Sequence, residues 1–539
     1  MNSHPRPFRK ILAAALLSAA LVPTGFLPHT APAQAAEQPQ RGGTLNIVVQ
    51  PEPPLLILGL NQQGPTQTVA GKIYEGLLTY DFDLSPKPGL ARSWEVSEDG
   101  KTYTFHLEEG VTWHDGEPFT ADDVVFSASE FLMDTHPRAR ANFSRAESIT
   151  ALDDHTVEFR LKEPFPAFLL AFEVSSAPMM PAHIYQGTDY RNNPMNGTPI
   201  GTGPFKFAEW VKGSHIHLTR NDAYWQEGKP YLDEIYFKVI PDAASRAVAL
   251  ESGSIQQTQY NAIEPFDVQR LAALPHVELE LKGYEFVAPM AWIEMNHRVE
   301  PLNDKRFRQA ILYALDREFI RDRIWFGLGR VPTGPVNSVT KFYEPDVTPY
   351  ALDRDKAVAL LDEMGLEPDA DGVRATVRFL PMPYGETWTR LAEYIKQSLG
   401  KVGIEVVLES TDAAGWVQRV SNWDYEMTTN FLYQYGDPAL GVARTYISDN
   451  IRKGVMFSNT MGYDNPEVDR LFAEAAQETD PEKRQALYSA VQKILVEDVP
   501  VAWLMEMEFP TLKDTRLKGS TTTAIGVNES YADAWLDMK

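Results

Sequence analysis

The sequence contains no cysteine in 539 residues. No disulfide framework can therefore hold the fold, and neither a thiol nucleophile nor a thiolate metal site can form. Hydrophobic packing must supply the stability, and a chain of this length is too long to fold around one core. We therefore expect two or three domains.

The N-terminal segment has the composition of a secretory signal peptide. Its basic residues are Arg6, Arg9 and Lys10. An apolar run over 11–22 follows, and Ala33-Gln34-Ala35 supplies a cleavage site of small residues. A membrane anchor is the alternative, but the run is shorter than the roughly 20 residues that span a bilayer. We expect cleavage after Ala35 and, without a cysteine to carry lipid, release of a soluble mature chain.

The charge balance is strongly acidic. Removal of residues 1–35 takes away three positive charges and no negative one, which changes the formal net charge from −24 to −27. Nucleic acid is a poor partner for such a surface because its phosphates repel it. An acidic balance could favour cationic ligands, but the simpler expectation is a solvated surface that keeps the protein monomeric in solution.

Turn residues and alternating apolar residues predict an α+β subdomain over 81–200. Asp99-Gly100 separates two alternating segments and is a strong hairpin signal. Thr120 can cap a helix, and Asp123 can reach back to it. The elements expected up to residue 200 are strands over 43–49, 94–96, 103–107 and 156–161 and helices over 70–78 and 120–133.

Strands and helices alternate after residue 200, which predicts a mixed sheet covered by helices. The expected strands are 235–240, 373–379, 404–408, 425–432 and 501–505, and the expected helices are 242–250, 356–364, 387–402, 416–420 and 481–495. A further helix begins near residue 302 and has an apolar face, and we expect Arg306, Arg308 and Arg317 to be solvated. The final strand is expected to lead the chain back to the first domain.

Five motifs occur in order along the chain. They are LARSW (90–94), VTWHDGEPFTADDV (111–124), GTGPF (201–205), NDAYW (221–225) and DKRFRQAI (304–311). The sequence thereby resembles the family 5 bacterial extracellular solute-binding proteins, which include dipeptide, oligopeptide and nickel receptors of ABC importers.

The resemblance implies an α/β, two-lobed periplasmic binding protein fold, class II-like, with an extra subdomain in lobe I. The expected boundaries are 42–80, 201–295 and 510–539 for lobe I, 81–200 for the inserted subdomain and 296–509 for lobe II. A two-stranded hinge would close the lobes around a small solute, and an ABC permease with its ATPase would receive it. The expected location is the periplasm, and no cofactor is required.

The segment 430–438 is the expected centre of the ligand site. In peptide-binding relatives an aspartate in this segment pairs with the amino terminus of the peptide, and Gln434 takes that position here. A neutral amide gives a weaker bond than a charged one, so an ordinary peptide amine should bind weakly. Asp437 is a substitute anion, although it can equally cap the following helix, with Pro438 in its first turn.

Aromatic side chains in and near this segment are further candidates, because their flat apolar faces can stack on a ligand. They are Phe431, Tyr433, Tyr435 and, at a position resembling a pocket tryptophan of the family, Trp416. Each of them can instead belong to the core, since alternation along a strand directs only some of the side chains to one face. Glu52, in the loop after the first strand, is a weaker candidate.

Other classes of function find less support in the residues. No serine-hydrolase elbow, zinc-protease motif or phosphate-binding loop occurs, so no catalytic residue is expected, although a pair of carboxylates stays open. His215 and His217 could form a metal pair on a strand, but surface histidines are the simpler interpretation, and His114 is expected to bond to backbone.

The solute is expected to be peptide-like or opine-like. An oligosaccharide or a nickel chelate, and a chaperone or signalling role, remain alternatives.

Overall fold

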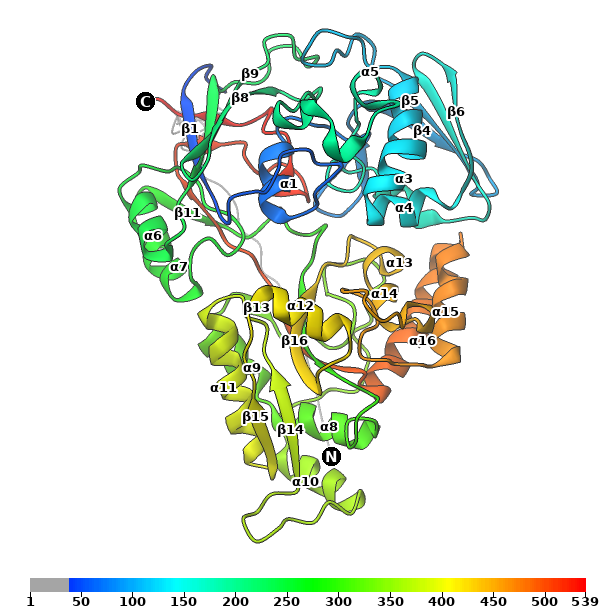
Figure 1. Cartoon of the computed structure of the whole chain (residues 1–539), viewed down its shortest axis with the longest axis vertical. Coiled ribbons are helices and arrows are strands. Elements are labelled where there is room, and N and C mark those ends of the chain that lie inside the picture. The colour runs from blue at the N-terminus through cyan, green and yellow to red at the C-terminus, as the bar shows by residue number, and fades with distance from the viewer. Residues whose placement is uncertain (1–37) are drawn as a thin grey trace, which may run out of the picture. The chain divides into compact units, whose positions relative to one another are not determined.

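The N-terminal sheet of the structure belongs to lobe I. The computed structural model describes residues 38–539 (Figure 1), and the predicted signal peptide lies outside them. The sheet has the order β1-β10-β9-β8, in which β1 and β10 are parallel. Its strands are β1 (Thr44–Val49), β8 (Phe205–Val211), β9 (His215–Arg220) and β10 (Glu234–Val239). The helices α6 (Ala243–Glu251) and α7 (Pro265–Ala272) follow it.

An antiparallel sheet in the order β4-β5-β7-β6 lies within the expected insert, residues 81–200. The elements of the insert are β4 (Ala91–Val96), β5 (Thr102–Leu107), α2 (Ala121–Phe126), a π-helical turn (Ser127–Phe131), α3 (Leu132–Thr135), α4 (Pro137–Phe143), β6 (Ala146–Asp153) and β7 (Thr156–Leu161). The predicted hairpin and the predicted helix start are confirmed. The backbone N–H of Thr120 donates to Asp123 Oδ2 at 3.0 Å, as the capping pattern requires.

The predicted helix over 70–78 is wrong. α1 spans Gly64–Ala70 and begins with Pro65 in its first turn. The chain then passes so close to other backbone that a Cβ on Gly71 would lie 2.1 Å from Asn528 O, and one on Gly76 would lie 2.4 Å from Phe172 O. The apolar residues after Ala70 therefore belong to a tightly packed turn that leads into β2 (Leu78–Tyr80).

Lobe II, residues 290–507, contains a six-stranded mixed sheet in the order β13-β17-β12-β16-β14-β15. Its strands are β12 (Met290–Met295), β13 (Gly329–Arg330), β14 (Ala375–Leu380), β15 (Ile404–Leu408), β16 (Met427–Leu432) and β17 (Val501–Met507). The main helices are α8 (Lys305–Ala314), α10 (Arg354–Glu363), α11 (Glu386–Gly400), α12 (Ala413–Ser421), α15 (Pro466–Gln477) and α16 (Pro481–Asp498). Because β12 pairs with β16 and β17, residues 290–295 belong to this lobe and not, as expected, to lobe I.

Residues 38–539 cross between the lobes twice, over 281–289 and over 508–510. On the lobe I side the two crossings are joined by the antiparallel pair β11 (Val277–Glu280) and β18 (Thr511–Asp514). The chain after β18 stays in lobe I, where Val527 O accepts a hydrogen bond from the buried Lys72 at 2.5 Å. The predicted return of the chain after its last long strand is therefore confirmed.

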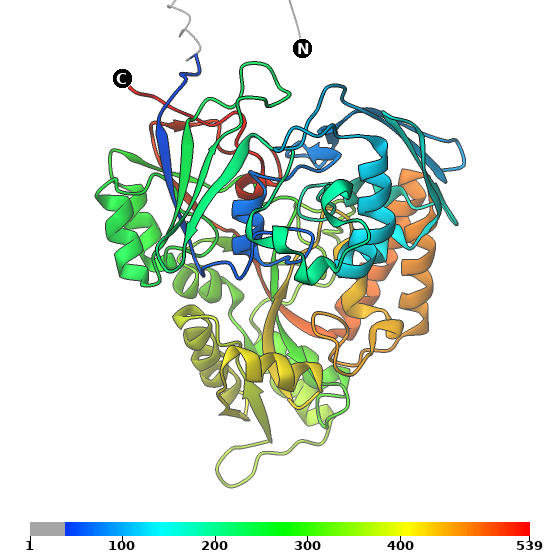
Figure 2. The ribbon, with the colours of Figure 1, turned by 45° about the horizontal axis from the view of Figure 1, so that its top comes forward.

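The lobes also meet away from these crossings. Figures 1 and 2 both show the insert beside α15 of lobe II, and the 3₁₀ turn Pro166–Ala171 contacts this helix. None of the helices in residues 38–539 is long and apolar enough to cross a membrane.

Two arginines expected in solvent are instead buried in lobe II. Arg308 is 4% exposed and Arg317 is 8% exposed. Arg308 donates to the carbonyl oxygens of Leu302, Asn303, Asp498 and Val499, at 2.8 to 3.0 Å. Burial lowers the pKa of its guanidinium to about 10, which leaves it charged at neutral pH. Helical spacing predicted the apolar face of α8 but not that a guanidinium would join α8 to the C-terminal end of α16.

We expect Arg308→Met to lower the free energy of unfolding by about 3 kcal/mol or more, because buried carbonyls lose their donors at a cost of ~1–3 kcal/mol each. Arg306→Met is the matched control on the same helix. Its side chain is 40% exposed and pairs with Asp304, so its loss should cost less than about 1 kcal/mol. Urea unfolding followed by circular dichroism measures both, and equal effects would contradict the clamping role of Arg308.

Candidate functional site: a cavity between the lobes

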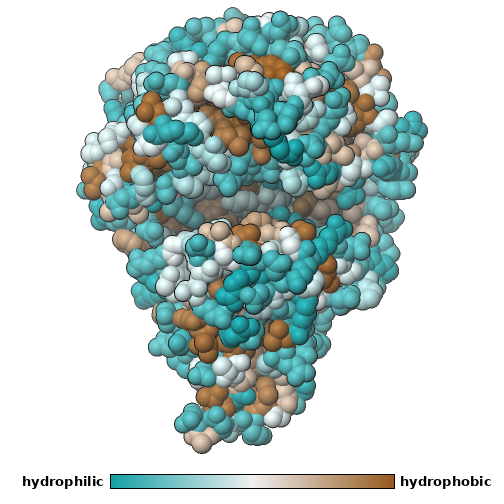
Figure 3. Space-filling model, viewed as in Figure 1, coloured by the Kyte–Doolittle hydropathy of each residue, from teal (hydrophilic) through white to brown (hydrophobic). Residues whose placement is uncertain are grey.

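Two neighbouring cavities lie between the lobes. The larger has a volume of about 1050 Å³ and is lined by α4 of the insert and by lobe II residues between Tyr435 and Ala476. The smaller, about 10 Å³, lies beside the crossing segment 281–289. Figure 3 shows the surface hollowed where the two lobes meet. Arg138 and Tyr435 line both cavities, so they stand at the boundary between them.

Two arginines lie close to the ring of Tyr435. The guanidinium carbon of Arg138 is 4.2 Å from the ring centroid, and that of Arg444 is 5.4 Å from it. Arg138 comes from the insert, whereas Tyr435 and Arg444 come from lobe II, Arg444 on α14 (Ala443–Tyr446). Cation–π attraction stabilises such pairs. The arrangement places positive charges of both lobes at one point of the cavity wall.

Local structure fixes the position of Arg138. His136 caps α4, with its Nδ1 accepting from the N–H of Ala139 at 3.1 Å. Its Nε2 and Arg138 Nη2 both donate to Ser175 O, at 3.1 and 2.6 Å. Burial lowers the pKa of His136 to about 3, so the ring is neutral at physiological pH, as these bonds require.

On the lobe II side, Tyr435 has a φ of 51° in the turn after β16 and Gly436 one of 74°. A Cβ on Gly436 would lie 3.4 Å from Leu84 Cδ1 and 3.5 Å from Leu170 Cδ1, so lobe I packs directly on this turn. Arg444 donates to Tyr433 O at 3.1 Å and to Gly441 O at 3.2 Å. Burial lowers the pKa of Arg444, and the neighbouring charge of Arg138 lowers it further.

The predicted residue Gln434 is buried, and its amide bonds to backbone. Its Nε2 donates to Pro335 O at 2.9 Å, and its Oε1 accepts from the N–H of Asn337 at 2.9 Å. The side chain lines neither interlobe cavity and instead holds the loop over 335–337. The position of Gln434 in the sequence gave no indication that its amide would bond to this loop.

Asp437 also points away from the two cavities. It accepts from the N–H of Ala439 at 2.9 Å and caps α13 (Pro438–Gly441), as the helix-cap alternative predicted. It also forms a buried ion pair with Arg484, with oxygen–nitrogen distances of 2.9 Å. Because this charge is already neutralised, the structure does not support Asp437 as the anion for a ligand amine.

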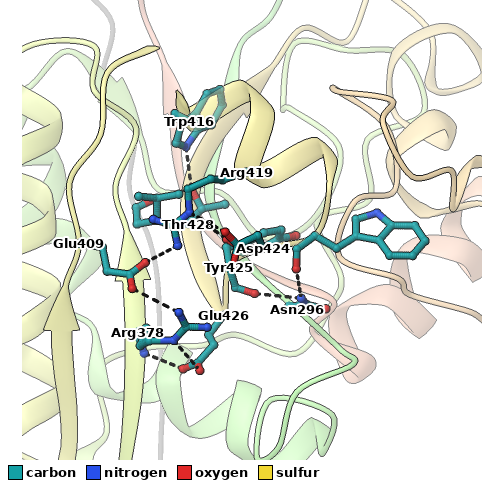
Figure 4. A network of polar contacts seen from close by, with 11 residues as sticks. Asn296, Arg378, Glu409, Trp416, Arg419, Asp424, Tyr425, Glu426 and Thr428 are labelled. Atoms are coloured by element: carbon teal, nitrogen blue, oxygen red, sulfur yellow. Dashed lines mark hydrogen bonds and ion pairs between the residues drawn. The ribbon is translucent and has the colours of Figure 1, made fainter. Parts of the chain in front are cut away.

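Trp416 is a core residue of lobe II. The side chain is fully buried, and its Nε1 donates to Thr428 Oγ1 at 2.9 Å. Figure 4 shows a charged network beside this contact, in which Glu409 accepts from Arg419 at 2.6 Å and from Arg378 at 3.3 Å. The network joins α12 to the sheet, and Trp416, itself a residue of α12, bonds to Thr428 of β16.

The remaining candidates are partly buried and line neither cavity. The ring of Phe431 stacks on Trp388 with centroids 5.9 Å apart, and Tyr433 lies between Phe431 and Tyr435 at 5.9 and 6.0 Å. Glu52 accepts from Trp210 Nε1 at 2.8 Å in the sheet of lobe I. Of the seven predicted ligand residues, Tyr435 is therefore the one that these two cavities contain.

Arg138 and Arg444 were not among the predicted residues. Arg444 lies shortly after the predicted segment 430–438, within two short helical turns. This closeness in the sequence was the signal that could have identified it. Arg138 lies in another lobe, and nothing local to it indicates that it meets Tyr435.

The histidines agree with their structural interpretation. His114 Nε2 contacts Gly203 O at 2.9 Å, and its Nδ1 accepts from the N–H of Gly201, so the predicted backbone bonds are confirmed. His217 pairs with Glu234 at 2.9 Å and stacks on Tyr236, while His215 pairs with Glu209 at 3.3 Å. Within residues 38–539, no group of three or more metal-binding side chains comes together.

Two lobes that are joined by paired crossings and enclose a cavity define a two-lobed binding protein. The family model of the bacterial extracellular solute-binding proteins, family 5 (middle region), matches residues 85–453. The chain belongs to this family, whose members are binding proteins.

Individual relatives agree over nearly the whole chain. The oligopeptide-binding protein AppA of Bacillus subtilis is 29% identical over 498 residues, covering 87% of this chain and 87% of AppA. The solved ABC transporter substrate-binding protein CtaP of Listeria monocytogenes has a TM-score of 0.81 and 28% identity, covering 92% of this chain and 100% of CtaP. The PBP AgaA of A. tumefaciens R10, solved with agropinic acid, has a TM-score of 0.76 and 27% identity, with coverage of 92% and 99%.

We expect Asp437→Asn to destabilise the protein by about 3–5 kcal/mol, because it leaves the buried Arg484 without its counter-charge. Asp449→Asn is the control, since Asp449 is exposed at the large cavity and its substitution should change stability by less than about 0.5 kcal/mol. Denaturant unfolding of the ligand-free proteins measures both. An Asp437→Asn variant of unchanged stability that loses affinity for amines would reinstate Asp437 as a ligand residue.

Proposed function

We propose that the protein is the solute receptor of an ABC importer, which captures a small organic solute between its lobes and presents the closed form to the membrane permease. The observation that supports this proposal is that both lobes contribute side chains to the cavity wall. Arg138 of the insert and Tyr435 of lobe II are in contact there, so a solute at this point touches both lobes at once.

Contact with both lobes is the condition for ligand-driven closure. A ligand shifts an equilibrium between open and closed forms only by its difference in affinity for the two. A solute held by Arg138 and Tyr435 has this difference, because opening separates the two side chains. The two segments that pass between the lobes are joined by the paired strands β11 and β18, and such a connection is suited to hinge bending.

A peptide-like or opine-like solute fits the size and chemistry of the site. The cavity of about 1050 Å³ is slightly larger than the usual range for small-molecule sites, about 300–1,000 Å³. AppA is named for oligopeptides, and AgaA was solved with agropinic acid. We propose that the chain acts as a monomer in the periplasm, after cleavage of its leader near Ala35, without a catalytic step.

The absence of native cysteine allows a direct test of closure. Cysteines introduced at Glu147 in β6 and Lys483 in α16 would carry a fluorophore pair, one in each lobe. Peptides and opines that bind should raise energy transfer and remain chemically unchanged on recovery. Closed receptor should then stimulate ATP hydrolysis by its importer in proteoliposomes. Binding without closure, or consumption of the ligand, would contradict the receptor role.

Tyr435→Ala should weaken binding of the same ligand about tenfold or more, since a central aromatic contact at a binding site typically contributes at least 1.4 kcal/mol. Tyr236→Ala, on the sheet of lobe I beside His217, is the matched control and should bind normally. Titration of energy transfer measures both variants, and equal affinities would remove Tyr435 from the site.

A further inference from the structure

We infer that Leu84 and Leu170 of the insert form an apolar latch against Gly436 of lobe II, which stabilises the closed receptor before any solute binds. This inference rests on the proposed closure of the lobes. It adds a contribution to closure that does not depend on the solute, and it assigns that contribution to the insert.

The first support is the burial of the two leucines by the opposite lobe. Leu84 is 1% exposed and Leu170 is 5% exposed. A Cβ on Gly436 would lie 3.4 Å from Leu84 Cδ1 and 3.5 Å from Leu170 Cδ1, so both side chains touch lobe II. Leu440 and Ala476 of lobe II pack against the same apolar cluster. Opening of the lobes removes this cover and exposes apolar surface to water, which is unfavourable.

The second support is the rigid presentation of these side chains. Leu84 lies in the turn between β2 and β3 (Pro86–Pro88), where its N–H donates to Asp81 O at 2.8 Å. Its φ is 65°, a left-handed conformation that is rare for leucine. Tyr80 Oη donates to Leu169 O at 2.5 Å and thereby joins this hairpin to the 3₁₀ turn that contains Leu170. Strain of this kind is typical of segments with a functional role.

The third support is a second contact between the insert and lobe II. A Cβ on Gly100, in the turn between β4 and β5, would lie 3.0 Å from Thr479 Cγ2 in the loop before α16. The 3₁₀ turn Pro166–Ala171 also contacts α15. Three loops of the insert therefore meet lobe II, on the side that Figures 1 and 2 show beside α15.

The latch is separate from the surfaces that a solute would touch. Leu84, Leu170 and Gly436 line neither interlobe cavity. They are therefore positioning residues, which act on binding through closure. The apparent affinity of a solute scales with the fraction of receptor that is already in the binding-competent form. A latch that raises this fraction improves binding without contact to the solute.

Energy transfer between fluorophores at positions 147 and 483 measures the ratio of closed to open form. The receptor is first unfolded and refolded to remove bound solute. Leu84→Ala and Leu170→Ala should each lower this ratio about tenfold, which corresponds to about 1.4 kcal/mol, because each removes apolar surface that closure buries. Circular dichroism and urea unfolding establish that each variant is folded, and the two single variants test the latch separately.

Leu152→Ala is the matched control. Leu152 lies on β6 of the insert and is 54% exposed, so its truncation should leave the energy transfer unchanged. Leu170→Met keeps an apolar side chain of similar volume and should close as the parent protein does. A general loss of stability would not separate Leu170→Ala from Leu170→Met in this way.

The measurement without solute decides the inference. If Leu84→Ala and Leu170→Ala gave the same energy transfer as Leu152→Ala, the latch would be overturned. Trialanine and agropinic acid, added to the parent protein, test the receptor function separately. A rise in energy transfer with either probe, together with unchanged ligand-free values in the variants, would leave the receptor function intact and remove the latch alone.

Discussion

The structure depends on one constraint, which is that residues 38–539 pass between the lobes at two places joined by the β11–β18 pair. Each lobe therefore completes its own sheet and core. No single lobe contains the whole wall of the interlobe cavity, since Arg138 and Tyr435 come from different lobes. Because contacts across the cavity form when the lobes are together, a solute that binds both sides stabilises the closed arrangement. Recognition and closure are thus one event.

Most elements of the fold could be predicted because their signals are local. A strand is visible where apolar residues alternate, and α16 begins where the sequence predicted, with the carboxylate of Asp480 as its cap. The helix over 70–78 failed because close backbone contacts with Asn528 and Phe172 decide the conformation there. The burial of Arg308 was missed for a related reason, since its carbonyl partners include residues at the far end of α16.

The site was less predictable than the fold. Tyr435, predicted from its segment, lines the cavity, but Gln434 in the same segment bonds to a loop, Asp437 forms an ion pair, and Trp416 lies in the core. Residue type cannot distinguish a cleft aromatic from a core aromatic when both follow buried strands. Arg138 depends on a contact between lobes that no local pattern contains. The grouping of Arg138, Tyr435 and Arg444 becomes visible when both sides of the cavity are considered together.

A crystal structure of the protein purified from its native host with the bound solute tests the central claim most directly. The account predicts a solute between the lobes that contacts both Arg138 of the insert and Tyr435 of lobe II. A solute bound elsewhere, for example in the cavity of about 290 Å³ beside Glu75 in lobe I, would contradict it. So would a solute that contacts one lobe alone.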